Sequence, residues 1–420
     1  MNSEIVKTAL FCAGALGIVG AASWIEPDAY KAEIYSDTGQ AFFPNLRDVQ
    51  TVKAIEVVDY DEAEAAARPL KVEFRKNRWL LTSHSDYPAE ARDRLTKTAA
   101  SLVDLQKELA VSDRWEDQAN FAVIDPLDAK SASLTGRGKR VTLRDGQGVT
   151  LAELILGKPM KEKPGYRYVR QPGQKRTYAV KTDADPSARF EDWVESDLVR
   201  VAYNDVAAMT LNSYQIDELS GRPANLRRLR MVKDKENWDA TAKSIAYAVG
   251  GLRVAGARPK PPVLAQQLRE GQLALTLDMV MSLRQRGFFI TPFGQLLSNE
   301  GELIVDSVKG VQYTLRFGEV VSEGASPKQR ESRYLFITVS SKTPEAEPIA
   351  KAMQAKFSDW YYVISGADFA KLHPQAAAAK GQAPMPQGFP PSVLRQLQQQ
   401  QQQQGVPQQP PPPPPQPRQP

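Results

Sequence analysis

The feature that most constrains the fold of this 420-residue chain is a set of landmarks that occurs twice in the same order. The first landmark is Leu70–Thr82, where apolar side chains alternate before a charged turn and Trp79. A similar pattern returns at 229–241, with Leu229, Met231 and Trp238 in the matching places. Alternation with a period of two followed by a turn predicts a β-hairpin, and the tryptophan is expected to close a core.

The spacing between paired landmarks changes smoothly along the chain. It is 159 residues for Trp79 and Trp238, 161 for Gly157 and Gly318, and 166 to 167 for three further pairs, which are 121–126 with 288–292, 167–169 with 333–335, and 190–193 with 357–360. This period is too long for a solenoid repeat. We therefore predict an internal duplication, with two similar α+β domains at 51–200 and 201–373, each made of an antiparallel sheet and helices.

Helices are expected at four places within these domains. Residues 88–109 carry one apolar stripe, which begins at a proline in a favoured first-turn position. Residues 190–199 are expected to form a short amphipathic helix. In the second half, a helix carries Ile245 and Val249, and residues 263–286 read as a helical insertion that the first half lacks.

Residues 1–30 have the features of a membrane anchor. Thr8–Trp24 contains no charged residue and would span about 25 Å as a helix at 1.5 Å per residue. Lys7 precedes it and Trp24 lies at its far boundary, which favours a cytoplasmic N-terminus and a body outside the membrane. Two other interpretations stay open, namely a cleaved signal peptide and a buried helix of a soluble domain.

Two polar segments flank the expected domains. Residues 31–50 show little periodicity and are expected to form a linker. Residues 374–420 are rich in alanine, glutamine and proline, with a glutamine run that reaches Gln404. Such a composition cannot bury enough apolar area to offset its ordering entropy, so we expect a disordered tail. The tail is either a flexible spacer or a proline-rich ligand for another protein.

The sequence carries no recognisable catalytic, cofactor-binding or metal-binding motif. The single cysteine, Cys12, lies in the apolar N-terminal segment, and His84 and His373 are far apart, so neither a cysteine nucleophile nor a metal site is expected. Paired carboxylates such as Glu116 and Asp117 leave a carboxylate-dependent hydrolase as a remote alternative. The net charge of +5 is spread along the chain, so we expect no binding of nucleic acid.

Four tryptophans lie at paired landmarks. A ring at the same place in both copies indicates packing in the core of each repeat rather than a platform for a ligand. We therefore assign a repeat-core role to Trp79, Trp193, Trp238 and Trp360.

A group of basic residues on the second hairpin is the candidate interaction surface. It consists of Arg227, Arg228, Arg230, Lys233 and Lys235. The alternation of a strand places Arg228 and Arg230 on one face, while Leu229 and Met231 face the core. The basic face is either simply solvated or contacts anionic lipid or an acidic partner.

In combination, these motifs resemble those of the bacterial domain-of-unknown-function 4340 family. The resemblance rests on the N-terminal segment, the Trp79 hairpin, the leucine-striped helix, LILGK at 154–158, YRYVR at 166–170 and FEDW at 190–193. It covers residues 50–200 well and 205–373 less well, because the second copy has the insertion and lacks the lysine after Gly318. The resemblance implies a membrane-anchored extracytoplasmic protein, often associated with ABC-type exporters, with no assigned catalytic residues.

These observations predict a non-enzymatic accessory or scaffold protein of the bacterial inner membrane. It would cross the membrane once, with its N-terminus in the cytoplasm and its body in the periplasm. The expected partners are the membrane itself and the permease of an ABC-type transporter or other envelope proteins. The alternative function is a periplasmic binding module for cell-wall glycan, lipid or peptide.

Overall fold

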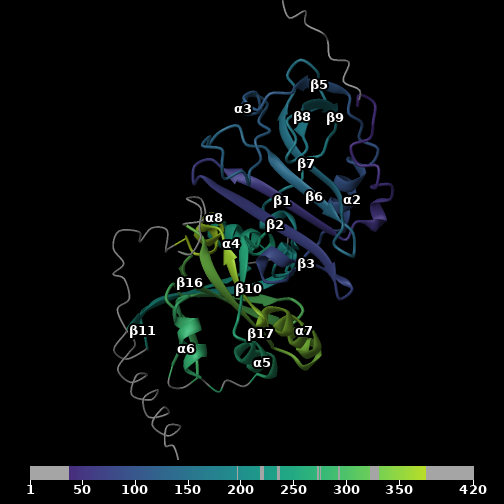
Figure 1. Cartoon of the computed structure of the whole chain (residues 1–420). Coiled ribbons are helices and arrows are strands. Elements are labelled where there is room, and N and C mark those ends of the chain that lie inside the picture. The colour runs from purple at the N-terminus through teal and green to yellow at the C-terminus, as the bar shows by residue number, and fades with distance from the viewer. Residues whose placement is uncertain are drawn as a thin grey trace, which may run out of the picture.

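The computed structural model describes residues 37–195, 197–217, 222–233, 237–271, 274, 276–291, 294–321 and 331–374. These residues form an α+β protein with two large antiparallel sheets and several helices, which confirms the α+β class of the prediction (Figure 1). The expected anchor and all but the first residue of the expected tail lie outside the described residues. Within the described ranges, no helix combines the length and the apolar character that crossing a bilayer requires.

The first sheet has nine strands in the order β4-β3-β2-β1-β6-β7-β8-β9-β5. The strands are β1 (Ala54–Asp61), β2 (Ala66–Arg75), β3 (Arg78–Leu81), β4 (Tyr87–Pro88), β5 (Leu109–Ser112), β6 (Lys139–Arg144), β7 (Thr150–Pro159), β8 (Tyr166–Arg170) and β9 (Thr177–Lys181). The helical elements of this half are η1 (Val49–Thr51), η2 (Thr82–His84), α2 (Arg92–Ala100), α3 (Gln118–Phe121) and η3 (Phe190–Asp192).

The β2–β3 hairpin forms where the alternation of apolar residues predicts it. Leu70, Val72 and Leu81 are fully buried, so one face of the hairpin lies in the core. Lys76 and Asn77 occupy the turn with φ angles of 49° and 62°. Two consecutive residues in the left-handed backbone conformation form a tight hairpin turn whose twist matches that of the flanking strands.

Helix α2 is shorter than the apolar stripe of residues 88–109 predicts, because the chain beyond it finds other backbone partners. The helix ends at Ala100, and the N–H of Phe42 donates to the carbonyl of Leu105 at 2.8 Å. Residues 109–112 then join the sheet as β5. Leu102 and Leu105 are still buried, so the apolar stripe is used, but not within one long helix.

Part of the segment expected to be a polar linker belongs to the core of the first sheet. Phe42, Phe43 and Leu46 are buried. The ring of Phe42 packs edge-on against Tyr178 of β9, with ring centroids 5.1 Å apart. Three apolar side chains in a polar stretch are therefore enough to dock the start of the described chain onto the sheet.

The second sheet has seven strands in the order β11-β10-β15-β16-β17-β18-β12. The strands are β10 (Val206–Asp217), β11 (Arg222–Val232), β12 (Gly256–Pro259), β15 (Glu302–Ser307), β16 (Val311–Val320), β17 (Arg333–Ser341) and β18 (Trp360–Ile364). A separate small sheet pairs β13 (Phe288–Ile290) with β14 (Leu296–Ser298). The helical elements are η4 (Tyr203–Asp205), α4 (Ala240–Gly250), α5 (Pro262–Glu270), α6 (Leu277–Arg284), η5 (Pro344–Ala346), α7 (Glu347–Ser358) and α8 (Gly366–Leu372).

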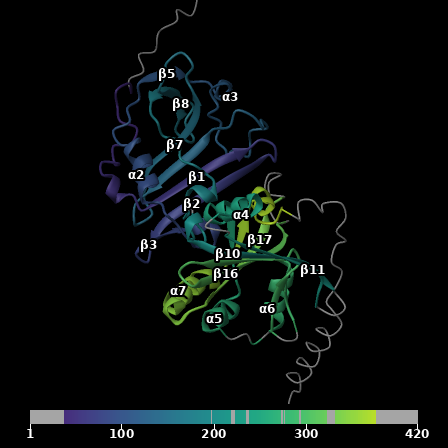
Figure 2. The same ribbon diagram turned by 180° about the vertical axis from the view of Figure 1, so that it is seen from behind.

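Both faces of the second sheet contribute residues to a buried cluster. On one face, Leu335 of β17 and Ile364 of β18 pack into the large core that also contains residues of α4 and α8. On the other face, Phe336 and Tyr361 pack into a second cluster with residues of α5 and α6. The predicted insertion therefore forms two helices that cover the face turned away from the first sheet (Figure 2).

The two sheets place their strands in corresponding order. Reading β11-β10-β15-β16-β17-β18-β12 against β2-β1-β6-β7-β8-β9-β5 matches each strand with one in the same position. The match extends to a local irregularity. The strand register shifts between Leu156 and Pro159 of β7, across Gly157, and between Phe317 and Val320 of β16, across Gly318. A guanidinium donates to each glycine carbonyl, from Arg167 at 3.1 Å and from Arg333 at 3.2 Å.

The pairing of 190–193 with 357–360 does not follow this topology. Trp360 begins β18, whereas Trp193 follows β9 and ends the short 3₁₀ turn η3. The expected helix over 190–199 is limited to η3 because its backbone has outside partners. The carbonyl of Trp193 accepts from the N–H of Glu90 at 2.8 Å, and the indole N–H donates to the carbonyl of Ser187 at 2.8 Å.

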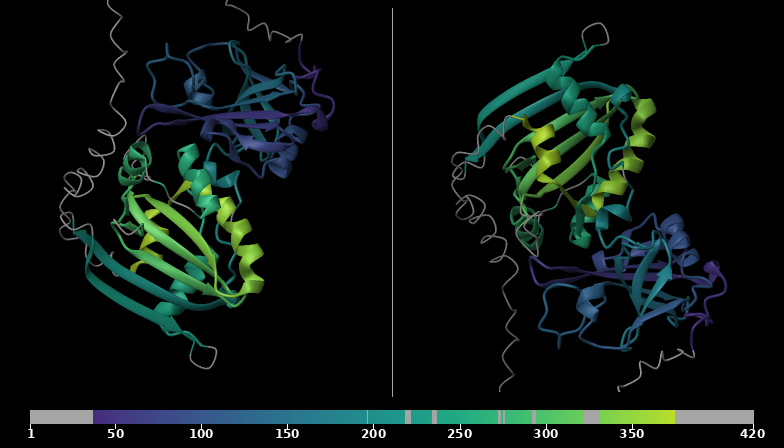
Figure 3. Two further views of the ribbon diagram at one scale, coloured as in Figure 1. Left: turned by 90° about the horizontal axis from the view of Figure 1, so that it is seen from below. Right: turned by 90° about the horizontal axis from the view of Figure 1, so that it is seen from above.

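One hydrophobic core cluster contains buried residues of both halves. The two halves lie against each other in the ribbon views (Figure 3). The rings of Tyr87 and Trp360 meet across the junction with centroids 4.9 Å apart. Beside them, Lys356 Nζ donates to Glu195 Oε2 at 2.8 Å. The described residues therefore pack as one body with two sheets.

Candidate functional site

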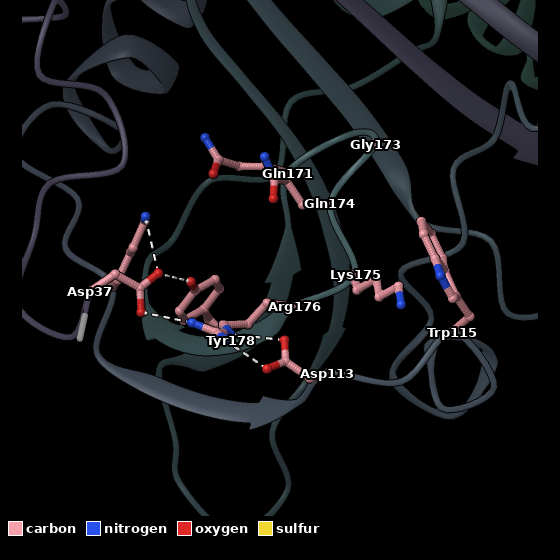
Figure 4. A pocket seen from close by; sticks show the side chains of 10 residues that line it. Asp37, Asp113, Trp115, Gln171, Gly173, Gln174, Lys175, Arg176 and Tyr178 are labelled. Atoms are coloured by element: carbon pink, nitrogen blue, oxygen red, sulfur yellow. Dashed lines mark hydrogen bonds and ion pairs between the residues drawn. The ribbon is translucent and has the colours of Figure 1, made fainter. Parts of the chain in front are cut away.

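A polar cavity of about 470 Å³ opens at the end of the first sheet, where β5 and the β8–β9 turn meet the start of the described chain (Figure 4). Acidic, basic, amide and aromatic side chains share its wall. The lining residues are Asp37, Lys107, Asp113, Trp115, Gln171, Gly173, Gln174, Lys175, Arg176 and Tyr178.

Arg176 organises one side of the cavity. Its guanidinium donates to both carboxylate oxygens of Asp113, at 2.8 and 2.6 Å, and its Nη1 donates to Asp37 Oδ1 at 3.1 Å. Asp37 also accepts from Lys107 Nζ at 3.2 Å and from the hydroxyl of Tyr178 (Figure 4). Two carboxylates therefore converge on one arginine, and the pair with Asp113 has the bidentate geometry that carboxylate recognition by arginine favours.

These contacts set the charge state of the network. Burial alone would raise the pKa of Asp37, but the hydrogen bonds from Tyr178 and Lys107 and the charges of Lys107 and Arg176 hold that pKa below its usual value. Burial, together with the bond to the Asp37 carboxylate, raises the pKa of Tyr178. The pKa of Arg176 is also raised, first by its hydrogen bond to Asp113. Asp37 is therefore ionised near neutral pH and unsuited to act as a general acid.

The other side of the cavity carries groups that can bind a ligand. The indole of Trp115 is 48% exposed, and Arg170 lies over it with the guanidinium carbon 5.8 Å from the ring centroid. Arg170 also donates to the carbonyl of Gln174 at 2.8 Å, which holds the β8–β9 turn and directs Gln171 and Gln174 to the cavity wall (Figure 4). An exposed aromatic face beside amide groups suits a polar ligand with an apolar surface.

The sequence alone does not reveal this cavity. Its charged residues come from the segment before β1, from the region around β5 and from the β8–β9 turn. Asp37 and Tyr178, for example, are 141 residues apart in the sequence. The carboxylate pair considered from the sequence, Glu116 and Asp117, lies beside it. Asp117 accepts from the hydroxyl of Ser112 at 2.6 Å, which gives it a structural role. No group of three or more histidine, cysteine, aspartate or glutamate residues in the described ranges could hold a metal ion.

The basic residues of the second hairpin lie on β11 and just after it. Arg227, Arg228 and Arg230 are exposed on this strand, and Lys233 follows it, whereas Lys235 lies outside the described residues. The expectation that Leu229 faces the core is wrong, because its side chain is 38% exposed. Met231 is buried as expected. Along the chain, β11 therefore reaches the core only after Leu229.

The four tryptophans differ in their surroundings. Trp193 and Trp238 are buried, and the indole N–H of Trp238 has no hydrogen-bond partner among the described residues. Trp79 and Trp360 are partly buried and pack against the same core. Trp79 contacts Phe74 with ring centroids 5.2 Å apart. None of the four lines the cavity.

Comparison with known families agrees with the resemblance seen in the motifs. Residues 79–265 match the family described as domain of unknown function (DUF4340), which confirms the predicted family. The match begins at Trp79 and extends through α4 into α5, so it includes most of the first sheet and the start of the second. No curated protein and no solved structure matches the chain.

Proposed function

We propose that this DUF4340-family protein is a non-enzymatic accessory or scaffold protein of the bacterial envelope. It is tethered to the inner membrane by residues 1–30, with its body in the periplasm, and works beside an ABC-type transport system. The charge-free segment Thr8–Trp24 supports the tether, and the resemblance to the family supports the association with a transporter.

The observation that carries this proposal is the single core that joins the two sheets. Proteins that clamp a small ligand between two lobes need an interface that opens around a hinge. Here the junction is held closed by two contacts, the ring pair of Tyr87 with Trp360 and the ion pair of Lys356 with Glu195. Both lie beside a continuous apolar core. A body of this kind is suited to holding partners at fixed positions.

The arrangement of the two sheets supports the proposed internal duplication. The corresponding strand order and the shared arginine-to-glycine-carbonyl bonds are difficult to explain unless both halves derive from one ancestral domain. The domain boundaries at residues 51–200 and 201–373 stay predictions. Duplication gives the body two related surfaces, which can diverge to contact different partners.

Co-purification tests the scaffold function. The full-length protein, expressed at its native level with an affinity tag, would be extracted in mild detergent and its partners identified by mass spectrometry. We expect a permease or an ATPase subunit of an ABC-type transporter to co-purify. A matched sample that lacks residues 1–30 separates association with the transporter from association with membrane fragments. Consistent recovery of the protein alone would contradict the proposal.

The cavity supports a second candidate function, the binding of cell-wall glycan, lipid or peptide. Trp115, Gln171 and Gln174 offer the stacking face and amide groups that a sugar uses. The test is sedimentation of the protein with purified cell wall, in parallel with the Trp115→Ala variant. Binding that this substitution abolishes supports the second function. A hydrolase is less well supported, because Arg176 engages both Asp37 and Asp113.

A further inference from the structure

The two sheets differ in how their edges are closed. Among the described strands of these two large sheets, four lie at sheet edges, and three of these are short: β4 has two residues, β5 has four and β12 has four. Short edge strands are a common protection against unwanted pairing. The fourth edge strand, β11, has 11 residues.

In the first sheet, the position that corresponds to the open edge of β11 is covered by a further strand. Its corresponding strand, β2, pairs on the outside with β3 over Val72–Arg75. In the second sheet, β11 pairs with β10, and no described strand pairs with its other side. In an antiparallel strand every second residue turns its N–H and C=O to the same side, so the outer side of β11 offers a row of backbone donors and acceptors.

The side chains along this edge are basic and apolar. Leu226 and Val232 are 49% and 54% exposed. Arg227 and Arg230 lie between them and pair with β10 through their backbones, but their side chains make no hydrogen bond or ion pair with any described residue. Arg228 Nε donates to Asn212 Oδ1 at 3.2 Å, and no carboxylate of the described residues forms an ion pair with its guanidinium group. Exposed apolar side chains on a long open edge are typical of a surface that binds a partner.

Charge identifies the kind of partner. A second copy paired through β11 would bring arginines beside arginines, and like charges on neighbouring strands are destabilising. The C-terminal residues 375–420 contain no aspartate or glutamate, and their many prolines lack the N–H that pairing requires. An extended segment with acidic residues would satisfy both the open backbone and the unpaired guanidinium groups.

We propose that Leu226–Val232 of β11 binds an acidic, extended segment of a partner protein by adding it as a further strand. This deepens the proposed scaffold function and rests on it, because it names the kind of segment that the scaffold holds. The start of the described chain and β11 lie at opposite ends of the body (Figures 1 and 3). A body tethered through its N-terminal end therefore presents β11 away from the tether.

The test uses the full-length chain in mild detergent and a fluorescent peptide of alternating glutamate and valine, about eight residues long. Binding is measured by fluorescence anisotropy, and hydrogen exchange reports on the amides of Leu226–Val232. Arg227→Glu/Arg230→Glu is the test variant. Lys76→Glu/Arg78→Glu, on the exposed turn of the β2–β3 hairpin, is the matched control with the same change of charge.

We expect the acidic peptide to bind, to slow exchange at Leu226–Val232 and to bind about tenfold more weakly to the test variant. The control variant should bind like the native protein. A lysine–valine peptide, and a glutamate–valine peptide interrupted by proline, should not bind. Equal binding of the proline-interrupted peptide, or binding without protection of Leu226–Val232, would overturn strand addition.

A membrane surface is the competing outcome. Vesicles that contain anionic phosphatidylglycerol would be added in place of the peptide. Binding to vesicles that the test variant loses, together with no binding of the acidic peptide, would overturn the proposal in favour of a lipid contact. If peptide binding succeeds but no transporter subunit co-purifies, the edge binds acidic strands while the transporter assignment fails. If a transporter subunit co-purifies but the test variant changes neither peptide binding nor partner binding, the proposal for the β11 edge is rejected and the transporter association stands.

Discussion

The contact around Gly318 leads to a sharp prediction about stability. A Cβ at this position would overlap the carbonyl oxygen of Arg286 and lie 2.7 Å from Phe288 Cζ. Carbon atoms normally approach to about 3.5–4.0 Å, so the overlap with the ring is about 1 Å. The same Arg286 carbonyl accepts the N–H of Glu319 at 2.9 Å. Relief of the overlap must therefore also stretch this hydrogen bond between β16 and the segment that follows α6.

The expected cost of Gly318→Ala follows from these two contacts. Overpacking of a well-packed core costs about 1–3 kcal/mol, and the strained backbone hydrogen bond contributes about 1 kcal/mol. We therefore expect the free energy of unfolding to fall by about 2–4 kcal/mol. Gly157→Ala, where the new Cβ would lie 2.6 Å from Val123 Cγ1, should lower it by a similar amount.

Urea unfolding followed by tryptophan fluorescence measures this effect. If the free energy of unfolding falls by about 3 kcal/mol per molar urea, the midpoint of the urea unfolding curve should fall by about 1 M. The matched control is Gly146→Ala, because the nearest atom to its new Cβ is Lys53 Cγ at 3.5 Å, and its effect should stay within about 0.5 kcal/mol. A Gly318→Ala protein with the same midpoint as the Gly146→Ala protein would refute the packing argument.

Two further substitutions test charged groups. The pKa of Asp37 is held below its usual value, so its contribution to stability is present above the unfolded pKa and is lost as the pH falls through the folded one. Asp37→Asn should therefore lose about 1–2 kcal/mol at pH 7 and little at pH 3 in urea titrations, and an equal loss at both would contradict the ion pairing. Burial lowers the pKa of Lys260, whose Nζ donates to Phe357 O at 2.8 Å and Trp360 O at 2.7 Å. The free energy of unfolding should rise with pH between the lowered pKa of Lys260 in the folded protein and its pKa in the unfolded chain. Lys260→Met should abolish that rise and should lower the free energy of unfolding by about 2–4 kcal/mol at pH 7. An unchanged pH profile would show that Lys260 does not titrate on unfolding.

Local patterns in the sequence predicted the parts of the fold that local forces decide. The alternation at Leu70–Leu81 predicted the first hairpin, and the apolar spacing at 263–286 predicted the helices α5 and α6. The end of α2 was missed because the carbonyl of Leu105 has a backbone partner at Phe42, far away along the chain. The helix expected at 190–199 does not extend beyond η3, because the carbonyl of Trp193 also has a distant backbone partner, Glu90.

The candidate site was harder to predict than the fold. The network of Asp37, Lys107, Asp113, Arg176 and Tyr178 forms only when β5 and β9 pair at the edge of the sheet and the start of the described chain docks beside them. Each residue taken singly is an ordinary polar residue of a loop or strand. The residues of β11 were visible in the sequence because they are neighbours along one strand. Their open edge was not, because it depends on which strands pair.

The difference between the two sheets has a consequence for how the protein is used. If both sheets descend from one ancestral domain, the strand that closes β2 is the feature that the second sheet does not reproduce among its described strands. A long open edge exposes a protein to aggregation, and selection normally removes it. The arginines of β11 discourage pairing with a second copy, yet they leave the backbone free for an acidic segment. An edge that is protected against self-association but open to an oppositely charged strand is expected of a binding surface, whereas a strand that only completes a sheet has no need of it.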